Sequence, residues 1–600
     1  MCRLQSAAKR PAPGCSGAAR LRRVVFCRCH EESGPGMAAT DWTMVALWVV
    51  GTSLLGAYFQ RYVGSTRDYL LAGRRLRWWQ IATAQAADAV DATDFVATTG
   101  QGFRTGMTQI GYAWWGMGIG TILLSRYLTP LLYPTGVYTN AEYLELRFTP
   151  ALRIASAVLQ VLYRFVAMAL VVYAMATMLK VIVGMELWHG VWAAMGLTLV
   201  YVLAAGQLGV VMAAIPQVAL MILTSVLIFF FAARDVGGWS GLQAHAQSLG
   251  SSLHLAGYSE SGVPGGVYLW GLILTLVTYP IVNQTVAQRI LAARSEVDAR
   301  RGTMASLIPW CLITGVSTLV GLFGVILLPG LEGAQADTLF PLYMKHYLPA
   351  GLLGLGVATL MVASMSTGAG IGTAIAGLIT VDVLKGGYAR DDRLRLRLTW
   401  LFASLSIVCG TLFAMFIEGF GGMIPFYVAF TGTFFLPLTV PYVGGALYRR
   451  ASRGAGMAAL VAGIVLGTVL FVGYEVPRIT GRTALALPVE LGHPKWRPFW
   501  VLGFASTVFV VWSMVENRRR GPIPSDELAS VLNSFDLGRP ASPDEVRRLI
   551  QSRGLRPWAR HQELDYNVLG IPLALRWYAH PAILEVAAIA ALGILMVWWW

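Results

Sequence analysis

Charged side chains are scarce in this chain: they make up only 13% of its 600 residues. A soluble domain usually carries about 25%, so the composition excludes an ordinary soluble protein. Cysteine is also sparse, with four of the six cysteines among the first 29 residues. One short Cys27–His30 cluster is too little to define a zinc site. We find no nucleophile–base set either, which argues against an enzyme.

Long apolar runs are what the chain has instead. Hydrophobic residues reach 56%, and runs near the roughly 20 residues that span a bilayer as a helix recur throughout. The short alternating segments of a β-barrel are missing. The sequence predicts an all-α polytopic membrane protein with about 14 transmembrane helices. The predicted spans are 43–60, 79–103, 107–134, 153–183, 188–205, 209–233, 266–288, 304–330, 351–383, 398–418, 421–447, 455–475, 498–515 and 581–600.

Arginine sets the predicted orientation in the membrane. The net charge of +15 comes from arginines in short loops between spans, which membrane topology explains better than a nucleic-acid partner does. These loops all fall on one side of the predicted spans. We therefore expect a multi-pass protein of the plasma (cytoplasmic) membrane, with the N-terminus outside and the insert 518–578 in the cytoplasm.

The same pattern divides the chain into segments. Residues 1–40 are basic and rich in Gly, Pro and Ser, so we expect a disordered leader, with Met37 as the true start. The remaining segments are an extra span with a cytoplasmic loop (41–78), a first repeat (79–233), an exterior loop (234–265), a second repeat (266–447), two additional spans (448–517), the insert (518–578) and a last span (579–600).

The stretch Ala72–Phe103 is the most unusual predicted span, because it carries three aspartates: Asp88, Asp91 and Asp94. A carboxylate at bilayer depth is costly and usually faces a bundle interior or an aqueous cavity. The small and polar residues around it predict a helix that breaks partway, which is tolerated only where the freed backbone is buried or lines water. Ion and substrate sites of secondary transporters are built in this way.

Five motifs occur in an order that resembles a known family. They are Leu71–Arg74 with Trp78-Trp79, Gly100–Phe103 with Gly106, Thr139–Phe148, Asn283-Gln284 with Gln288-Arg289 and Leu291–Ser295, and Asp382–Lys385. Through these motifs the chain, over about 43–450, resembles the sodium:solute symporter family, which includes sodium–sugar, sodium–proline and sodium–carboxylate transporters.

The resemblance implies a leucine-transporter-like core of two inverted five-helix repeats, in which the first helix of each repeat is discontinuous. It also implies sodium as the coupling ion and a small-molecule solute as the cargo. Ungapped alignment places the sodium ligands on the backbone carbonyls of Ala87, Val90 and Ala363 and on the hydroxyls of Ser366 and Thr367. Residues 363, 366 and 367 share one helix face. Hydroxyls that merely bond their own helix are the alternative.

The resemblance also implies substrate or gate positions. Tyr279 occupies the place of an aromatic inner gate, just after an expected break at Thr278–Pro280; a packing tyrosine at a proline kink is the alternative. Asn283 and Gln284 either contribute to the cavity or cap the half-helix. The sugar carriers have polar residues at four positions where this chain has Ala113, Gly116, Leu276 and Ala214. The implied solute is therefore not a typical sugar.

The aspartates leave several roles open. One could be protonated, one could contact sodium, one could bind an amine or hydroxyl of the solute, and one could pair with Arg164, the basic side chain well inside a span. We expect Asp91 or Asp94 to contact solute or ion and Asp88 to lie near the ion. Sodium-coupled symport is the leading hypothesis. A transporter-like sensor and proton-coupled transport through the aspartates are the alternatives.

Overall fold

The structure, a computed structural model, describes residues 37–60, 66–204, 207–245, 250–331, 333–384, 392–420, 422–480, 487–523 and 581–599. The expected leader up to residue 36, and residues 524–578 of the expected insert, lie outside the described residues. Within the described part of the chain the regular structure is helical, apart from isolated β-bridges such as the one between Leu76 and Ala293.

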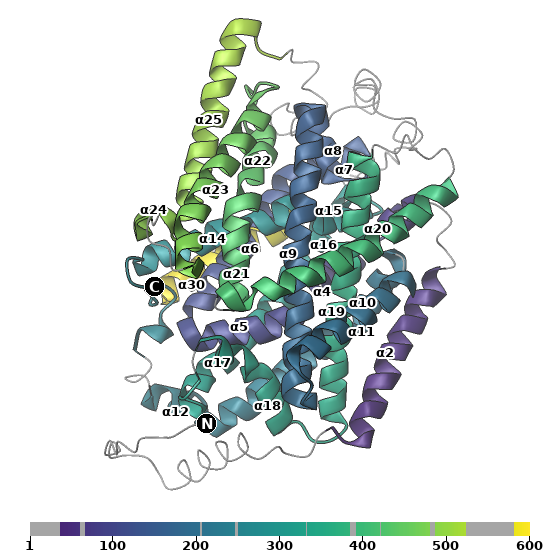
Figure 1. The fold of residues 1–600 in the computed structure, drawn as a ribbon, viewed down its shortest axis with the longest axis vertical. Helices are drawn as coiled ribbons and strands as arrows, with labels where there is room; N and C mark the ends of the chain where they lie inside the picture. Colours follow the sequence, from purple (N-terminus) through teal and green to yellow (C-terminus); the bar gives the residue numbers. More distant parts are fainter. Residues whose placement is uncertain are drawn as a thin grey trace.

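The first half of the chain forms the helices drawn from purple to blue (Figure 1). They are α2 (Ala39–Gln60), α3 (Thr66–Leu71), α4 (Trp78–Ala89), α5 (Ala92–Thr105), α6 (Thr108–Leu123), α7 (Thr129–Thr135), α8 (Asn140–Arg147), α9 (Pro150–Val183), α10 (Leu187–Ala204), α11 (Gln207–Val236) and α12 (Gly238–Ala244).

The second half forms the helices drawn from teal to yellow (Figure 1). They are α14 (Gly265–Val282), α15 (Gln284–Leu291), α16 (Glu296–Ala305), α17 (Leu307–Leu327), α18 (Leu339–Tyr347), α19 (Leu352–Gly377), α20 (Asp392–Phe413), α21 (Met423–Phe430), α22 (Thr439–Leu447), α23 (Ala455–Thr480), α24 (Val489–Gly492), α25 (Arg497–Arg520) and α30 (Pro581–Trp599).

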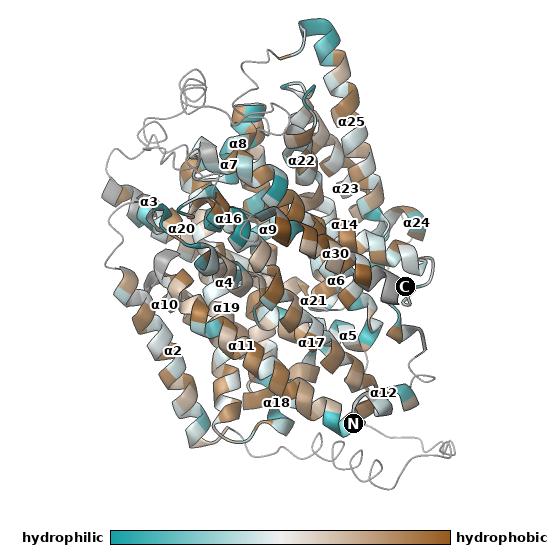
Figure 2. Cartoon of the chain, turned by 180° about the vertical axis from the view of Figure 1, so that it is seen from behind, coloured by the Kyte–Doolittle hydropathy of each residue, from teal (hydrophilic) through white to brown (hydrophobic). Residues whose placement is uncertain are grey.

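Among the described residues, nine helices are long and apolar enough to cross a membrane. Two of these spans contain π-helical turns. The span Leu352–Val383 ends in one, and the span Met423–Leu447 has one between α21 and α22. Apolar residues run along the sides of helices such as α2 and α23, whereas the free end of α25 is hydrophilic (Figure 2). The polytopic all-α class predicted from composition is thus confirmed.

Two groups of helices meet at the centre of the molecule. In one group α5 packs on α17, α6 on α14 and α4 on α16. In the other, α9 packs on α10 and α20, and α19 on α10 and α20. The helix α11 contacts both groups, and α22, α23 and α25 stand together at the periphery (Figure 1). This arrangement places α4, α5, α9, α14 and α19 around one interior space.

Two glycines permit the closest of these crossings, between α5 and α17. A Cβ on Gly321 would lie 2.1 Å from the carbonyl oxygen of Thr99, and a Cβ on Gly102 would lie 2.4 Å from that of Thr318. Each helix therefore approaches the other at a glycine. Small residues are the usual means of bringing membrane helices into backbone contact.

We expect Gly321→Ala to destabilise the protein by about 1–3 kcal/mol, because the added methyl group forces α5 and α17 apart. The melting temperature of the purified protein in detergent measures this effect. Gly196→Ala is the matched control, since it also adds a methyl group to a helix but has no atom within 4 Å of the new Cβ. Equal melting temperatures for the two variants would contradict this account of the crossing.

Candidate functional site

The predicted interruption of the first aspartate-bearing span is confirmed, at Val90 and Asp91. Val90 is extended (φ −121°, ψ 112°), and so is Asp91 (φ −132°, ψ −167°). Asp91 Oδ1 accepts a hydrogen bond from Thr93 N (2.6 Å), and Asp94 Oδ2 accepts one from Asp91 N (3.2 Å). The two carboxylates thus cap the start of α5, where negative charge is stabilised.

This capping leaves two carbonyl groups of the break without their helical partners. Asp91 N, which a continuous helix would direct to Ala87 O, donates instead to Asp94. Asp94 N donates to Asp91 O and not to Val90 O. Buried carbonyl groups need another partner. Ala87 O finds one in Thr367 Oγ1 of α19, which donates to it over 3.2 Å.

The five residues that the resemblance implies as sodium ligands therefore lie on the two helices that cross here. Ser366 is one residue from Thr367 on the same helix; its Oγ donates to Ala363 O (3.0 Å). Ala363 and Val90 are fully buried. Carbonyl and hydroxyl oxygens are the donor set that a hard monovalent cation takes, so the residues present fit a sodium ion.

Gln217 is a neighbour of this set that the sequence did not indicate. It lies on α11 and donates from Nε2 to Ser366 Oγ (2.8 Å), while its own Oε1 is buried and has no hydrogen-bond partner in the part of the chain that the structure describes. Ala214, one of the positions where the resemblance implies a polar residue, lies three residues earlier on the same helix. A glutamine inside an apolar span was the only signal that could have found Gln217.

The second interruption lies between α14 and α15, at Asn283. The expected break at Thr278–Pro280 is wrong, because the helix continues through Pro280 to Val282. Proline removes only its own backbone N–H donor, and the helix tolerates that loss. A full break would leave several backbone groups without their helical partners. Asn283 supplies the missing acceptor: its Oδ1 accepts from Thr285 N (2.8 Å), as an N-cap residue does.

Asn283 and Gln284 are not among the residues that line the cavity described below, so the cavity role considered for them is corrected. Asn283 acts as the cap. Gln284 accepts from Asn140 N (2.9 Å) and donates to Tyr138 O (3.2 Å), which ties α15 to the loop helix α8.

Asp88 has a partner that the sequence did not predict. Its carboxylate bonds the guanidinium of Arg289 on α15 at 2.7 and 2.9 Å, and the Arg289 side chain is fully buried. Arg164, which we considered as a partner for one of the aspartates, forms no hydrogen bond or ion pair within 4 Å with any described residue, although its charge acts on Asp88 from a greater distance. Arg289 had been assigned to a cytoplasmic loop; the short helix α15 turns it inward. Gly370 leaves room for the pair, since a Cβ there would lie 2.9 Å from Asp88 Oδ1.

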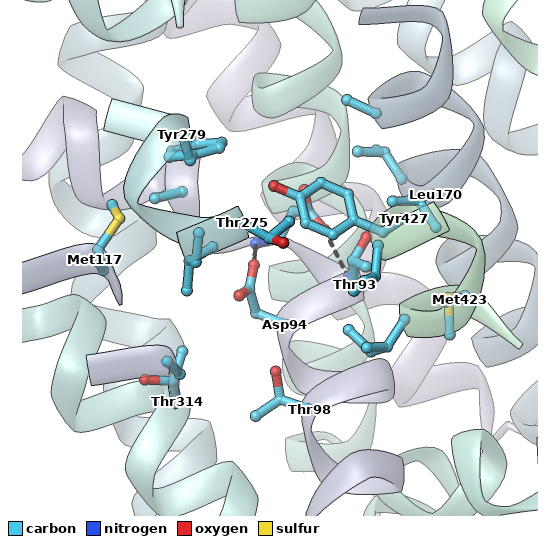
Figure 3. A pocket seen from close by; sticks show the side chains of 18 of the residues that line it. Thr93, Asp94, Thr98, Met117, Leu170, Thr275, Tyr279, Thr314, Met423 and Tyr427 are labelled. Atoms are coloured by element: carbon cyan, nitrogen blue, oxygen red, sulfur yellow. Dashed lines mark hydrogen bonds between the residues drawn. The ribbon is translucent and has the colours of Figure 1, made fainter. Parts of the chain in front are cut away.

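A cavity of about 170 Å³ lies against the first break. All three aspartates, Arg164, Tyr279 and the proposed ion ligand Thr367 contribute to its wall. In the close view Asp94 lies centrally, with Thr98 and Thr314 to one side and Tyr279 and Tyr427 to the other (Figure 3). Pockets of this kind, largely apolar with a few convergent polar groups, are where small molecules bind.

Ion pairs bridge the elements on both sides of the cavity. At the C-terminal end of α5, Arg104 contacts Asp337 at 2.8 Å. At the other side, Arg153 at the start of α9 contacts Glu142 (2.9 Å), Glu145 (2.5 Å) and Asp382 (2.5 Å). Burial raises the pKa of Glu142, in the loop helix α8, to about 7 although Arg153 opposes that rise. The Thr139–Phe148 motif thus holds α8 to the ends of α9 and α19.

Two broken helices beside a cavity that carries several charged groups define a secondary transporter of the broken-helix type. The sequence profile of the sodium:solute symporter family matches residues 69–464. The chain belongs to this family, and it is a membrane transporter with sodium as its coupling ion, not an enzyme.

The relatives that this chain resembles are named for different solutes. A Vibrio parahaemolyticus "Sodium/glucose cotransporter" is 26% identical over 72% of this chain and 84% of its own. A Homo sapiens "Sodium/glucose cotransporter 4" is 22% identical over 86% and 81%. A Mus musculus "Sodium-coupled monocarboxylate transporter 2" is 24% identical over 76% of each chain. A solved structure of a Na⁺-coupled sialic acid symporter has a similar fold (TM-score 0.66, 17% identity, 81% of this chain and 99% of that one).

We expect Asp88→Asn to lower the free energy of unfolding by about 3–5 kcal/mol, because it leaves the buried Arg289 without a counter-charge. The double variant Asp88→Asn/Arg289→Gln should lose clearly less stability than the sum of the losses in the two single variants. Thermal unfolding in detergent measures these losses. Arg294→Gln is the control: Arg294 pairs with Asp298, but its side chain is 52% exposed, so its loss should cost no more than about 1 kcal/mol. Additive losses in the double variant would contradict the pairing.

Proposed function

We propose that this protein is a symporter of the plasma membrane that couples the entry of sodium to the movement of a small organic solute by alternating access. One observation carries the proposal: Thr367 Oγ1 bonds the freed carbonyl of Ala87 and also lines the cavity beside it. An ion held by these oxygens and a solute in the cavity would share one wall. Binding of either would then favour the other, and such coupling is reciprocal by thermodynamic necessity.

In this proposal the sodium ligands are Ala87 O, Val90 O, Ala363 O, Ser366 Oγ and Thr367 Oγ1. Two features support them. The break leaves Ala87 O and Val90 O without helical partners. Ser366 and Thr367 come from α19, on the other group of helices. A cation between the two groups would hold them together when bound and allow them to separate when it leaves.

The motion itself is assigned to two inverted five-helix repeats, 79–233 and 266–447, within a chain of 14 spans whose N-terminus is outside and whose insert, 518–578, is cytoplasmic. The support is that α4/α5 and α14/α15, the first helices of the two proposed repeats, are both interrupted. Such interruptions in corresponding positions of two halves are typical of inverted-repeat transporters. Tyr279, half-buried against the cavity near the end of α14, is the proposed inner gate.

The proposed solute is not a typical sugar. Ala113 and Leu276 line the cavity where sugar carriers have hydrogen-bonding residues, and a Cβ on Gly116 would lie 2.7 Å from Leu276. A sugar would bring several hydroxyl groups to this apolar wall, and unpaired polar groups are costly to bury. Asp91 and Asp94, which also line the cavity, are the proposed contacts to solute or ion.

We expect Ser366→Ala and Thr367→Val each to weaken sodium binding by about tenfold, the equivalent of about 1.4 kcal/mol for one lost ligand. The measurement is the concentration of NaCl, with KCl keeping ionic strength constant, that raises the melting temperature of the purified protein half-maximally. A proton-coupled mechanism would show no preference for sodium over potassium and a dependence on pH instead.

Ser364→Ala is the matched control for that measurement. Ser364 lies on the same helix and is fully buried, and its hydroxyl has no hydrogen-bond partner among the described residues. Its loss should leave the response to sodium unchanged. If Ser366→Ala and Thr367→Val respond to sodium as Ser364→Ala does, the proposed ion site is wrong.

A further inference from the structure

Arg164 is a buried cation that the architecture described so far does not use. It lies in the middle of α9 with 3% of its surface exposed, and it lines the cavity. Its Nη2 is buried without a hydrogen-bond partner among the described residues, and its guanidinium carbon lies 5.5 Å from the centre of the Tyr163 ring. Its charge acts on Asp88 from beyond ion-pair distance, and Arg289 already pairs with that carboxylate. A buried guanidinium is stable only when it is paired. An anionic group in the cavity would supply that partner.

The three aspartates differ in how far their charge is already balanced. Asp88 is neutralised by Arg289. Asp91 faces the N-terminus of α5, from which it accepts a hydrogen bond. Asp94 accepts one backbone hydrogen bond through Oδ2 and has no cationic partner among the described residues. Its carboxylate lies centrally in the cavity wall (Figure 3). A cationic group in the cavity would balance it.

The total charge of the site favours a solute that carries no net charge. The cavity and the pair beside it hold three carboxylates and the two guanidinium groups of Arg164 and Arg289. One negative charge is left over, and one sodium ion at the proposed site neutralises it. A solute without net charge then keeps the buried site neutral, whereas an anion or a cation would leave one charge uncompensated in a medium of low dielectric constant.

We propose that the solute is a small zwitterion of the amino-acid type. Its carboxylate lies on Arg164 and its ammonium group on Asp94. This inference rests on the proposed function, and it adds the chemical class of the cargo. A neutral polyol would satisfy the charge balance but would leave both Arg164 and Asp94 without a counter-charge.

The size and lining of the cavity limit the rest of the solute. Its volume of about 170 Å³ is close to that of cavities of about 150 Å³ that hold one benzene ring. A solute of roughly ten non-hydrogen atoms or fewer therefore fits. Met117, Leu170 and Met423 line the wall, and apolar walls favour an aliphatic side chain over a polar one.

The test is the thermal stability of the purified full-length protein in NaCl, with three sets of probes. The first set is the neutral amino acids alanine, valine and leucine. The second is their decarboxylated amines and the third their deaminated acids, which have the same carbon skeleton but one charge each. We expect at least one amino acid to raise the melting temperature, and to bind about 30-fold or more tightly than its two analogues, because each analogue leaves one buried charge unpaired.

Two variants assign the two charges. Arg164→Gln should abolish the preference for the amino acid over its amine, and Asp94→Asn should abolish the preference over its acid. Lys180→Gln, which removes an exposed cation from the same helix, is the control and should change neither. Arg164→Lys should restore part of the affinity that Arg164→Gln loses. Far-UV circular dichroism and a single symmetrical gel-filtration peak report that each variant is folded.

Three results would overturn the proposal: no amino acid stabilises the protein in sodium, a singly charged analogue binds as tightly as its amino acid, or Arg164→Gln keeps the wild-type preference. These results differ from a failure of the proposed function. In that case sodium would stabilise the protein no better than potassium does before any solute is added. A response to sodium together with tight binding of an acid alone would leave the symporter proposal standing and refute the zwitterion.

Discussion

The arrangement at the centre of this molecule depends on one backbone N–H group that bonds a side chain in place of its helical partner. Asp94 Oδ2 takes the hydrogen bond of Asp91 N, which in a continuous helix would have gone to Ala87 O. Because an unpaired carbonyl is costly in a membrane, Ala87 O must find another partner, and it finds Thr367 on a different group of helices. The residues that break the helix and the residues that fit an ion are therefore parts of the same hydrogen-bond arrangement.

The surrounding structure allows this arrangement to exist inside a bilayer. Glycines at the α5–α17 crossing bring the second half of the broken helix against the backbone of α17. At the other break, Asn283 accepts a hydrogen bond from the freed N–H group of Thr285. The buried pair of Asp88 and Arg289 joins the two breaks directly. Such a pair contributes little net stability when complete but makes its own loss costly. The two discontinuous helices are thus bound to each other, while α19 contacts the first break through Thr367 and α9 contributes Arg164 to the cavity wall.

Much of this was predictable from the sequence where the signal was local. Three aspartates among small residues indicated a broken helix, and the break lies within three residues of Asp88. The spacing of Ser366 and Thr367 placed both on one helix, and the structure brings that helix to the break. The proline at 280 misled, because proline is a strong local signal for a kink, whereas the hydrogen-bonding capacity of Asn283 decided where the chain opens.

The sequence by itself determined the membrane class, the family and the presence of buried carboxylates, because these depend on composition, hydrophobic length and short motifs. Only the tertiary structure decided which charges meet. Arg289 is 201 residues from Asp88 and Gln217 is 149 residues from Ser366, and no pattern along the chain records such distances. Arg164, one of the partners considered for the aspartates, lines the cavity and forms no ion pair with a described residue. Which buried charge is already balanced depends on how the helices pack, and that balance is what the solute meets.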